Sequence, residues 1–176
     1  MKSTASTVMT PLEAAVFGSF DGLPIHALVV HAAVILVPVA ALVGILFLRP
    51  AWRMKLRWPL VAAAALATAT VYVARESGEV LKESLGDGLK DNKAGEIVEH
   101  HQDLGDRLWL WLLAFLAVTI VVALVLPRLT TPLAGGAAAI IVAALAVVVI
   151  VLVAYTGHQG STAVWNPEGT VDYSGG

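Results

Sequence analysis

The chain contains no cysteine among its 176 residues, and this absence excludes several kinds of site at once. Disulfides, thiolate metal sites, cysteine-ligated iron–sulfur clusters and covalently attached c-type haem all need a cysteine side chain. Common enzyme signatures are missing too, because the sequence has no glycine-rich phosphate loop, no GxGxxG fingerprint and no nucleophile elbow. The sequence therefore favours a non-enzymatic role.

Charged residues are scarce as well. Only 14% of the residues are Asp, Glu, Lys or Arg, and the mean hydropathy is +0.81, which does not fit a protein with a water-exposed surface. The formal net charge of -2 argues against nucleic acid as a partner, because nucleic-acid binding needs a basic patch. The partner that this composition predicts is the lipid bilayer.

Four predominantly apolar segments are long enough to cross a membrane. A hydrocarbon core of about 30 Å needs roughly 20 apolar residues in helical form, and unbroken apolar runs favour helices over the alternating strands of a barrel. The sequence therefore predicts an all-α polytopic membrane protein, a four-transmembrane-helix bundle in which Pro59 starts the second helix. No internal repeat is evident. The predicted spans are residues 28–48, 59–76, 106–126 and 137–156.

The four segments define one transmembrane domain, residues 25–158, between a polar N-terminal arm, 1–24, and a polar C-terminal tail, 159–176. The arm lacks the apolar centre and small-residue cleavage site of a signal peptide, so we expect it to be retained. Gly157 and Gly160 permit a tight turn after the fourth helix. Small residues crowd the second and fourth helices and allow close packing, within one chain or in a homodimer.

Basic residues indicate how the bundle is oriented. The short connections between the first and second and between the third and fourth helices contain no acidic residue, whereas the opposite side holds all 13 acidic residues. Short loops rich in Lys and Arg stay on the cytoplasmic side. We therefore predict a multi-pass protein of the inner (cytoplasmic) membrane with both termini extracytoplasmic. The basic residues of the two short connections are Arg49, Arg53, Lys55, Arg57 and Arg128.

All five histidines fall at the predicted extracytoplasmic ends of the helices. His101 follows Ile97 and precedes Leu104 and Leu108 at helical spacing, so it lies on an apolar stripe and is expected to face the bundle. His100 lies on the neighbouring polar stripe and is expected to be solvated. The remaining three are His26 and His31 in the first helix and His158 after the fourth.

His31 lies about one turn inside the predicted membrane boundary. Exposing an ionisable side chain to lipid is costly, so such a residue usually faces a partner, water or a cofactor. We therefore expect His31 to face the bundle. His26 precedes it by five residues, which on a helix turns the two side chains about 140° apart.

Two segments carry a resemblance to a known family. The segment LPIHALVVHAAVILVPVAALV and the terminal TGHQGSTAVW, together with four spans, resemble the prokaryotic membrane family called domain of unknown function 2231, over nearly the whole chain. The matching motifs are a Pro-x-His-x4-His opening, here from Pro24 to His31, and a Gly-His-x-Gly turn at 157–160. The ending departs from the family's Gly-Gly-x-Leu-Val-Tyr, which weakens any role for the tail. Relatives joined to cytochrome c or Rieske-type domains imply a redox partner protein.

The histidines admit three interpretations. A b-type haem needs two axial ligands on facing helices, and His31 with His101 would supply them, while Arg75 and Arg107 could bind the haem propionates. Alternatively, zinc or copper could be held by imidazoles brought together by packing. The third interpretation is a structural or accessory membrane protein without any cofactor. The metal site would use His26, His31, His101 and His158, with Glu99 or Asp103 as an oxygen ligand.

Overall fold

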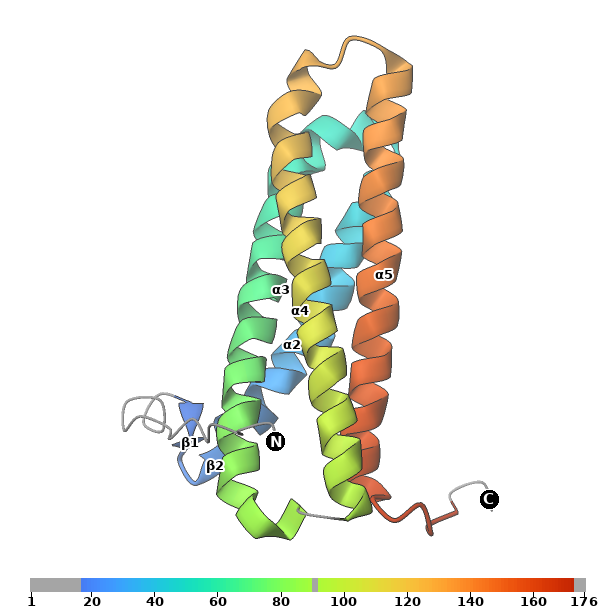
Figure 1. Cartoon of the computed structure of the whole chain (residues 1–176). Helices are drawn as coiled ribbons and strands as arrows, with labels where there is room; N and C mark the ends of the chain where they lie inside the picture. The colour runs from blue at the N-terminus through green and yellow to red at the C-terminus, as the bar shows by residue number, and fades with distance from the viewer. Residues whose placement is uncertain (1–16, 90–91, 173–176) are drawn as a thin grey trace, which may run out of the picture.

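The computed structural model describes residues 17–89 and 92–172, and four long helices dominate it (Figure 1). All four are long and apolar enough to cross a membrane. The predicted all-α, four-helix membrane fold is therefore confirmed. The helices are α2 (Ile25–Leu46), α3 (Pro50–Leu85), α4 (Lys93–Val125) and α5 (Pro132–Trp165), and the short elements are β1 (Ser19–Phe20), β2 (Leu23–Pro24), η1 (Gly86–Leu89) and η2 (Leu126–Arg128).

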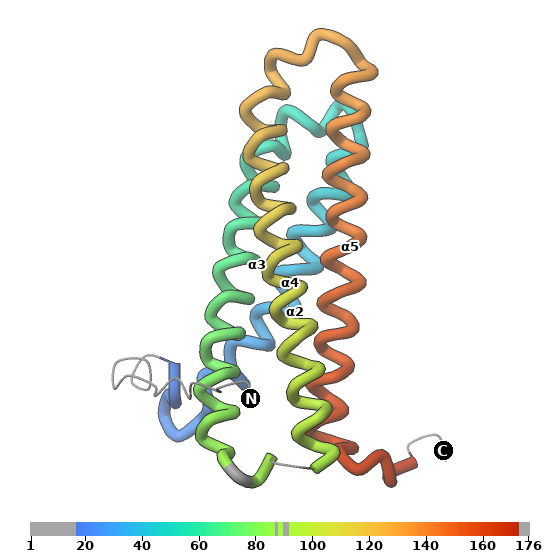
Figure 2. The backbone as a smooth tube through the Cα atoms, in the orientation of Figure 1, coloured from blue at the N-terminus to red at the C-terminus, as the bar shows by residue number. Residues whose placement is uncertain are grey.

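Consecutive helices run in opposite directions along the bundle. α2 packs against α3 and α5, and α4 packs against the same two helices, so α2 and α4 are diagonal to each other. Figure 2 follows the chain and shows that the start of α2, the connection from α3 to α4 and the end of α5 share one end of the bundle. We call this the histidine end, because it carries His26, His101 and His158.

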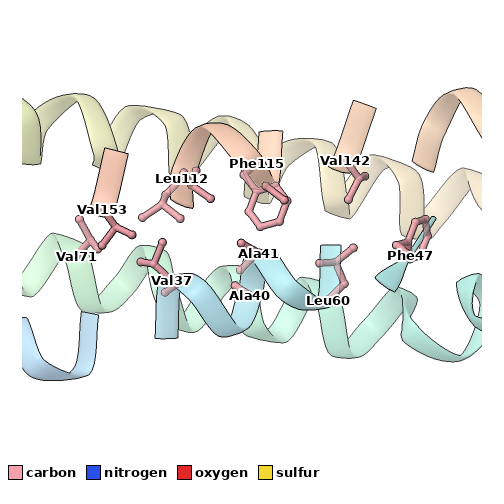
Figure 3. Close-up of a cluster of buried hydrophobic side chains, with 14 of the residues drawn as sticks. Val37, Ala40, Ala41, Phe47, Leu60, Val71, Leu112, Phe115, Val142 and Val153 are labelled. Carbon is pink, nitrogen blue, oxygen red and sulfur yellow. The ribbon is translucent and has the colours of Figure 1, made fainter. Parts of the chain in front are cut away.

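The bundle buries small side chains and exposes large apolar ones, as a protein in lipid does. Alanines fill much of the core, and a few larger residues such as Phe47 and Phe115 complete it (Figure 3). Leu66, Val121 and Ile140 point outward, where lipid is as good an apolar solvent as a protein interior. The buried hydroxyls donate to carbonyls of their own helices, and that of Thr68 also lies 3.4 Å from the carbonyl of Leu112 in α4. These hydroxyls belong to Thr68, Ser77 and Thr119.

Two predicted boundaries are wrong. α3 begins at Pro50 rather than at Pro59, because Pro50 sits in the first turn, where a missing N–H costs nothing. α5 continues through Gly157 and Gly160 to Trp165, so the predicted turn does not form and the tail predicted at 159–176 begins as helix. Glycine is tolerated in a helix where another group packs against it, and the contact at Gly160 is described below.

The described part of the N-terminal arm forms a small β-hairpin that the sequence did not predict. β1 pairs antiparallel with β2, and Asp21 and Gly22 make the turn with φ angles of 50° and 77°. The N–H of Ile25 donates to the carbonyl of Gly18 at 3.1 Å, which joins the hairpin to the first turn of α2. The rest of the arm lies outside the described residues. The hairpin therefore fixes the start of α2, where His26 lies.

Candidate functional site

A cavity of about 480 Å³ lies at the histidine end, and all four helices contribute to its wall. Its inner end is lined by Val71 and Val153, which belong to the hydrophobic core (Figure 3). It then passes His26 and His101 and reaches Leu85 near the end of α3. Most of the wall is apolar, and the two imidazoles are the titratable groups deepest in it.

His26 and His101 come from the diagonal helices α2 and α4 and approach each other across the cavity. Their ring centroids are 6.1 Å apart, and the ring planes are nearly perpendicular at 87°. Each ring is anchored to the next helix along the chain. Nδ1 of His26 donates to the carbonyl of Ala74 at 2.8 Å, and Nδ1 of His101 donates to the carbonyl of Thr156 at 2.9 Å.

These hydrogen bonds select the tautomer of both rings. A carbonyl oxygen can only accept, so Nδ1 must carry the proton in each ring. In a neutral imidazole the other nitrogen, Nε2, then keeps its lone pair and can bind a metal or accept a proton. Metal-binding histidines commonly donate their second nitrogen to a carbonyl in this way, because the bond fixes the ring and raises its basicity. The two rings are thus prepared as ligands or bases.

The prediction that His31 faces the bundle is wrong. Its side chain is exposed on the outside of α2, and its Nδ1 donates to the carbonyl of Ala27 in the same helix at 2.6 Å. The polar group is satisfied there without a partner from another helix. His26 and His31 point in different directions from the same helix, and it is His26 that lines the cavity. The structure therefore does not bring His31 and His101 together as the predicted axial pair.

The other histidines divide as follows. His101 faces the cavity, which confirms the prediction from its apolar stripe. His100 is exposed, as predicted, and His158 is exposed on α5. Within the described residues no group of three or more His, Asp or Glu side chains is placed to hold a metal ion. The structure thus does not assemble the predicted zinc or copper site from His26, His31, His101 and His158.

Of the two arginines predicted to bind propionates, Arg75 lines the cavity and Arg107 does not. Arg75 forms an ion pair with Asp106 across the gap between α3 and α4, and with Glu76 at 3.1 Å on its own helix. Its guanidinium also lies 5.3 Å from the ring centroid of Trp109. Arg107 is exposed. Arg75 therefore closes the rim of the cavity, with its charge already matched by carboxylates.

Lys82 and Gln102 are wall residues that sequence reasoning missed. Nζ of Lys82 donates to Oε1 of Gln102 at 2.7 Å and bridges α3 to α4. No periodic pattern distinguishes them, since both lie in polar segments. The inward direction of His26 was missed as well, because α2 is apolar on every side and the spacing of His26 gives no more signal than that of His31.

The family described as "Predicted membrane protein (DUF2231)" matches residues 22–172. The chain belongs to this family. The match covers all four helices and both cavity histidines, so the resemblance seen in the sequence motifs is confirmed. No curated protein and no solved structure matches the chain.

Proposed function

We propose that this DUF2231 protein binds a b-type haem between His26 and His101. The observation that carries the proposal is the pair itself: two imidazoles from diagonal helices that line one cavity, each with Nδ1 engaged, so that Nε2 of each neutral ring keeps its lone pair. In four-helix bundles, haem is commonly held by histidines that project inward from facing helices. Compared with the pair predicted from sequence, His26 takes the place of His31.

The spacing of the rings supports this assignment. Two imidazoles that bind one metal ion from opposite sides place their ring centroids roughly 6 Å apart, because a metal–nitrogen bond is about 2 Å and each centroid lies about 1.1 Å behind its nitrogen. The observed separation is 6.1 Å. A tetrahedral ion such as zinc would bring two rings closer together and would need further ligands. The separation therefore favours a centre with two axial histidines.

The surrounding wall supports a large apolar ligand with a polar edge. The cavity volume of about 480 Å³ is in the range of sites for cofactors and drug-sized ligands. Lys82 lies on the wall toward the outer rim, and a cation there suits a carboxylate substituent of the ligand. Arg75 is held by carboxylates and Arg107 is exposed. Lys82, by contrast, has a looser carboxylate neighbour, Oε1 of Glu99 at 3.9 Å. Lys82 is therefore the cation we assign to this role.

The proposed orientation places this site outside the cytoplasm. The basic connections lie at the end opposite the histidine end, and short basic loops remain cytoplasmic. Arg49 and Arg57 there lie over Trp52 and Trp58, with 5.1 and 5.7 Å to the ring centroids, as expected of interfacial anchors. In the inner membrane, a redox partner protein would then reach the haem from the extracytoplasmic side. The homodimer remains a prediction.

The proposal is tested by the visible spectrum of the purified protein, oxidised and then reduced with dithionite, after expression with added haem. We expect a Soret band and sharp reduced α and β bands, lost in His26→Ala and in His101→Ala. Three exposed histidines provide matched controls, and the bands should persist in all three. Size-exclusion chromatography would confirm that each variant is folded. The controls are His31→Ala, His100→Ala and His158→Ala.

A featureless spectrum of the haem-supplied wild-type protein would refute haem binding and leave the accessory-protein interpretation. Retention of the bands in a folded His26→Ala variant would refute the assigned ligand pair. Loss of the bands in His31→Ala would point back to the pair expected from the sequence.

A further inference from the structure

Each cavity histidine packs on a glycine of the neighbouring helix. A β-carbon at Gly160 would lie 2.9 Å from Cε1 and 3.2 Å from Nδ1 of His101, and one at Gly78 would lie 3.1 Å from the same two atoms of His26. At both glycines, the three atoms nearest to the added carbon all belong to the histidine ring. The missing side chains therefore make room for the imidazoles, which are the nearest groups at both glycines.

The two contacts have the same local construction. The carbonyl that accepts from His26 belongs to Ala74, four residues before Gly78, and the carbonyl that accepts from His101 belongs to Thr156, four residues before Gly160. Residues four apart lie one above the other on a helix. A side chain at the glycine would thus cover the carbonyl below it, so the glycine is what lets the ring reach its acceptor.

The equivalence extends into the hydrophobic core. The residues seven positions before the two glycines, Val71 and Val153, are both buried and both line the inner end of the cavity. Seven positions after the two histidines stand Ala33 and Leu108, which are buried as well. The halves α2–α3 and α4–α5 therefore repeat one arrangement, although their side chains differ enough that no repeat is evident in the sequence.

We infer that Gly78 and Gly160 are positioning residues for the histidine site, one in each of two equivalent helical hairpins that face each other across the cavity. Each hairpin supplies one imidazole, one acceptor carbonyl and one glycine against which the imidazole packs. We call this glycine the seat of the ring. A ligand held between the rings would then meet the same chemistry from both sides, which suits a planar centre that is bound on its two faces. The effect on the ligand rests on the proposed function, whereas the seating of the rings does not.

The seating is tested by a double-mutant cycle on the thermal unfolding of the full chain in detergent. Gly160→Ala should lower the midpoint by about 3 °C or more, because the new methyl group collides with the ring of His101. In a His101→Ala background the same substitution should not lower the unfolding midpoint, since no imidazole ring is present for the methyl group to collide with. In a His26→Ala background, Gly160→Ala should lower the midpoint by as much as it does in the wild-type protein. Coupling to His101 alone identifies the seat.

Two further variants control this cycle. Gly136→Ala is on the same helix but outside the cavity, and its β-carbon would lie within 4 Å of no described atom beyond the helix backbone around it, so its midpoint should stay level or rise, as alanine favours helix. Gly78→Ala should couple to His26 in the same way but more weakly, because its closest contact is 3.1 Å rather than 2.9 Å. An equal loss with and without the histidine would refute the seat.

The effect on the ligand is read separately, from the reduction potential and the reduced α band of the haem-loaded protein. Gly160→Ala should shift both, while Gly136→Ala, outside the cavity, should leave both at the wild-type values. If the wild type carries no haem, the proposed function fails and the thermal cycle alone decides the seats. A haem-loaded Gly160→Ala protein with unchanged potential and band would refute the positioning role even where the cycle shows coupling.

Discussion

At the residue scale, the direction of a single side chain decides the chemistry of this protein. His26 and His31 lie on one helix and differ by five positions, yet only His26 reaches the cavity, where the carbonyl of Ala74 in α3 accepts a hydrogen bond from its ring. Nδ1 of His31 instead donates to the carbonyl of Ala27 in its own helix. The hairpin of residues 19–24 precedes α2 and is joined to its first turn through the N–H of Ile25.

The core offers a second residue-scale prediction. Phe115 is fully buried, and its ring lies over Gly44, where a β-carbon would be 3.2 Å from Cζ. Phe115→Ala should lower the free energy of unfolding by about 3 kcal/mol, because the bundle cannot close the cavity that the ring leaves. Unfolding in mixed detergent and sodium dodecyl sulfate measures this change. Leu124→Ala, on an exposed surface of the same helix, should cost much less; an equal loss would contradict the packing described.

At the scale of the elements, the helices extend beyond the apolar segments that identify them. α3 continues to Leu85 and α4 begins at Lys93, so both reach past the spans predicted at 59–76 and 106–126. These extensions build the outer wall of the cavity, together with the last turns of α5. Gly86 follows the last residue of α3 as its C-cap, a position that glycine favours. Asn92 is the N-cap of α4.

Asn92 joins the two sides of the connection between α3 and α4. Its Oδ1 accepts from the N–H of Gly95 at 2.8 Å as a helix N-cap, and its Nδ2 donates to the carbonyl of Gly88 at 2.8 Å. Asn92→Ala should destabilise the first turn of α4 by about 1 kcal/mol. Hydrogen exchange of the Gly95 amide should then speed up roughly fivefold, while the amides near Phe115 keep their rates. In Asn92→Asp, which keeps the accepting oxygen, the Gly95 amide should exchange much more slowly than it does in Asn92→Ala.

At the scale of the whole molecule, the bundle has two chemically different ends. The histidine end carries the cavity and carboxylates such as Glu96 and Asp103, whereas the other end carries the arginines that lie over tryptophans. Such a division positions a bundle in a membrane, because basic residues are retained on the cytoplasmic side. It also places the candidate site at one end of the bundle.

The absence of cysteine makes this orientation directly testable. Single cysteines at exposed positions of the two ends, Glu96→Cys and Lys55→Cys, can be treated with a membrane-impermeant maleimide on intact spheroplasts. Glu96→Cys should be labelled at once, and Lys55→Cys only after the membrane is permeabilised. The cysteine-free parent is the background control. The opposite pattern would place the histidine site in the cytoplasm and would overturn the proposed side for a redox partner.

The sequence by itself determined the fold class and the end at which the histidines lie. Lipid offers no hydrogen bonds to the backbone, so four long apolar segments must form helices, and histidines in the segments between them must cluster at their ends. It also determined that His101 faces inward, because the start of α4 has both a polar and an apolar side.

Only the tertiary structure decided that His26, rather than His31, is the partner of His101. The first helix is apolar on every side, so its periodicity does not distinguish the core from lipid. What separates the two histidines is an acceptor carbonyl at Ala74 and an open glycine at Gly78, both supplied by α3. These groups come from a different segment of the chain, and they meet the ring only when the helices pack.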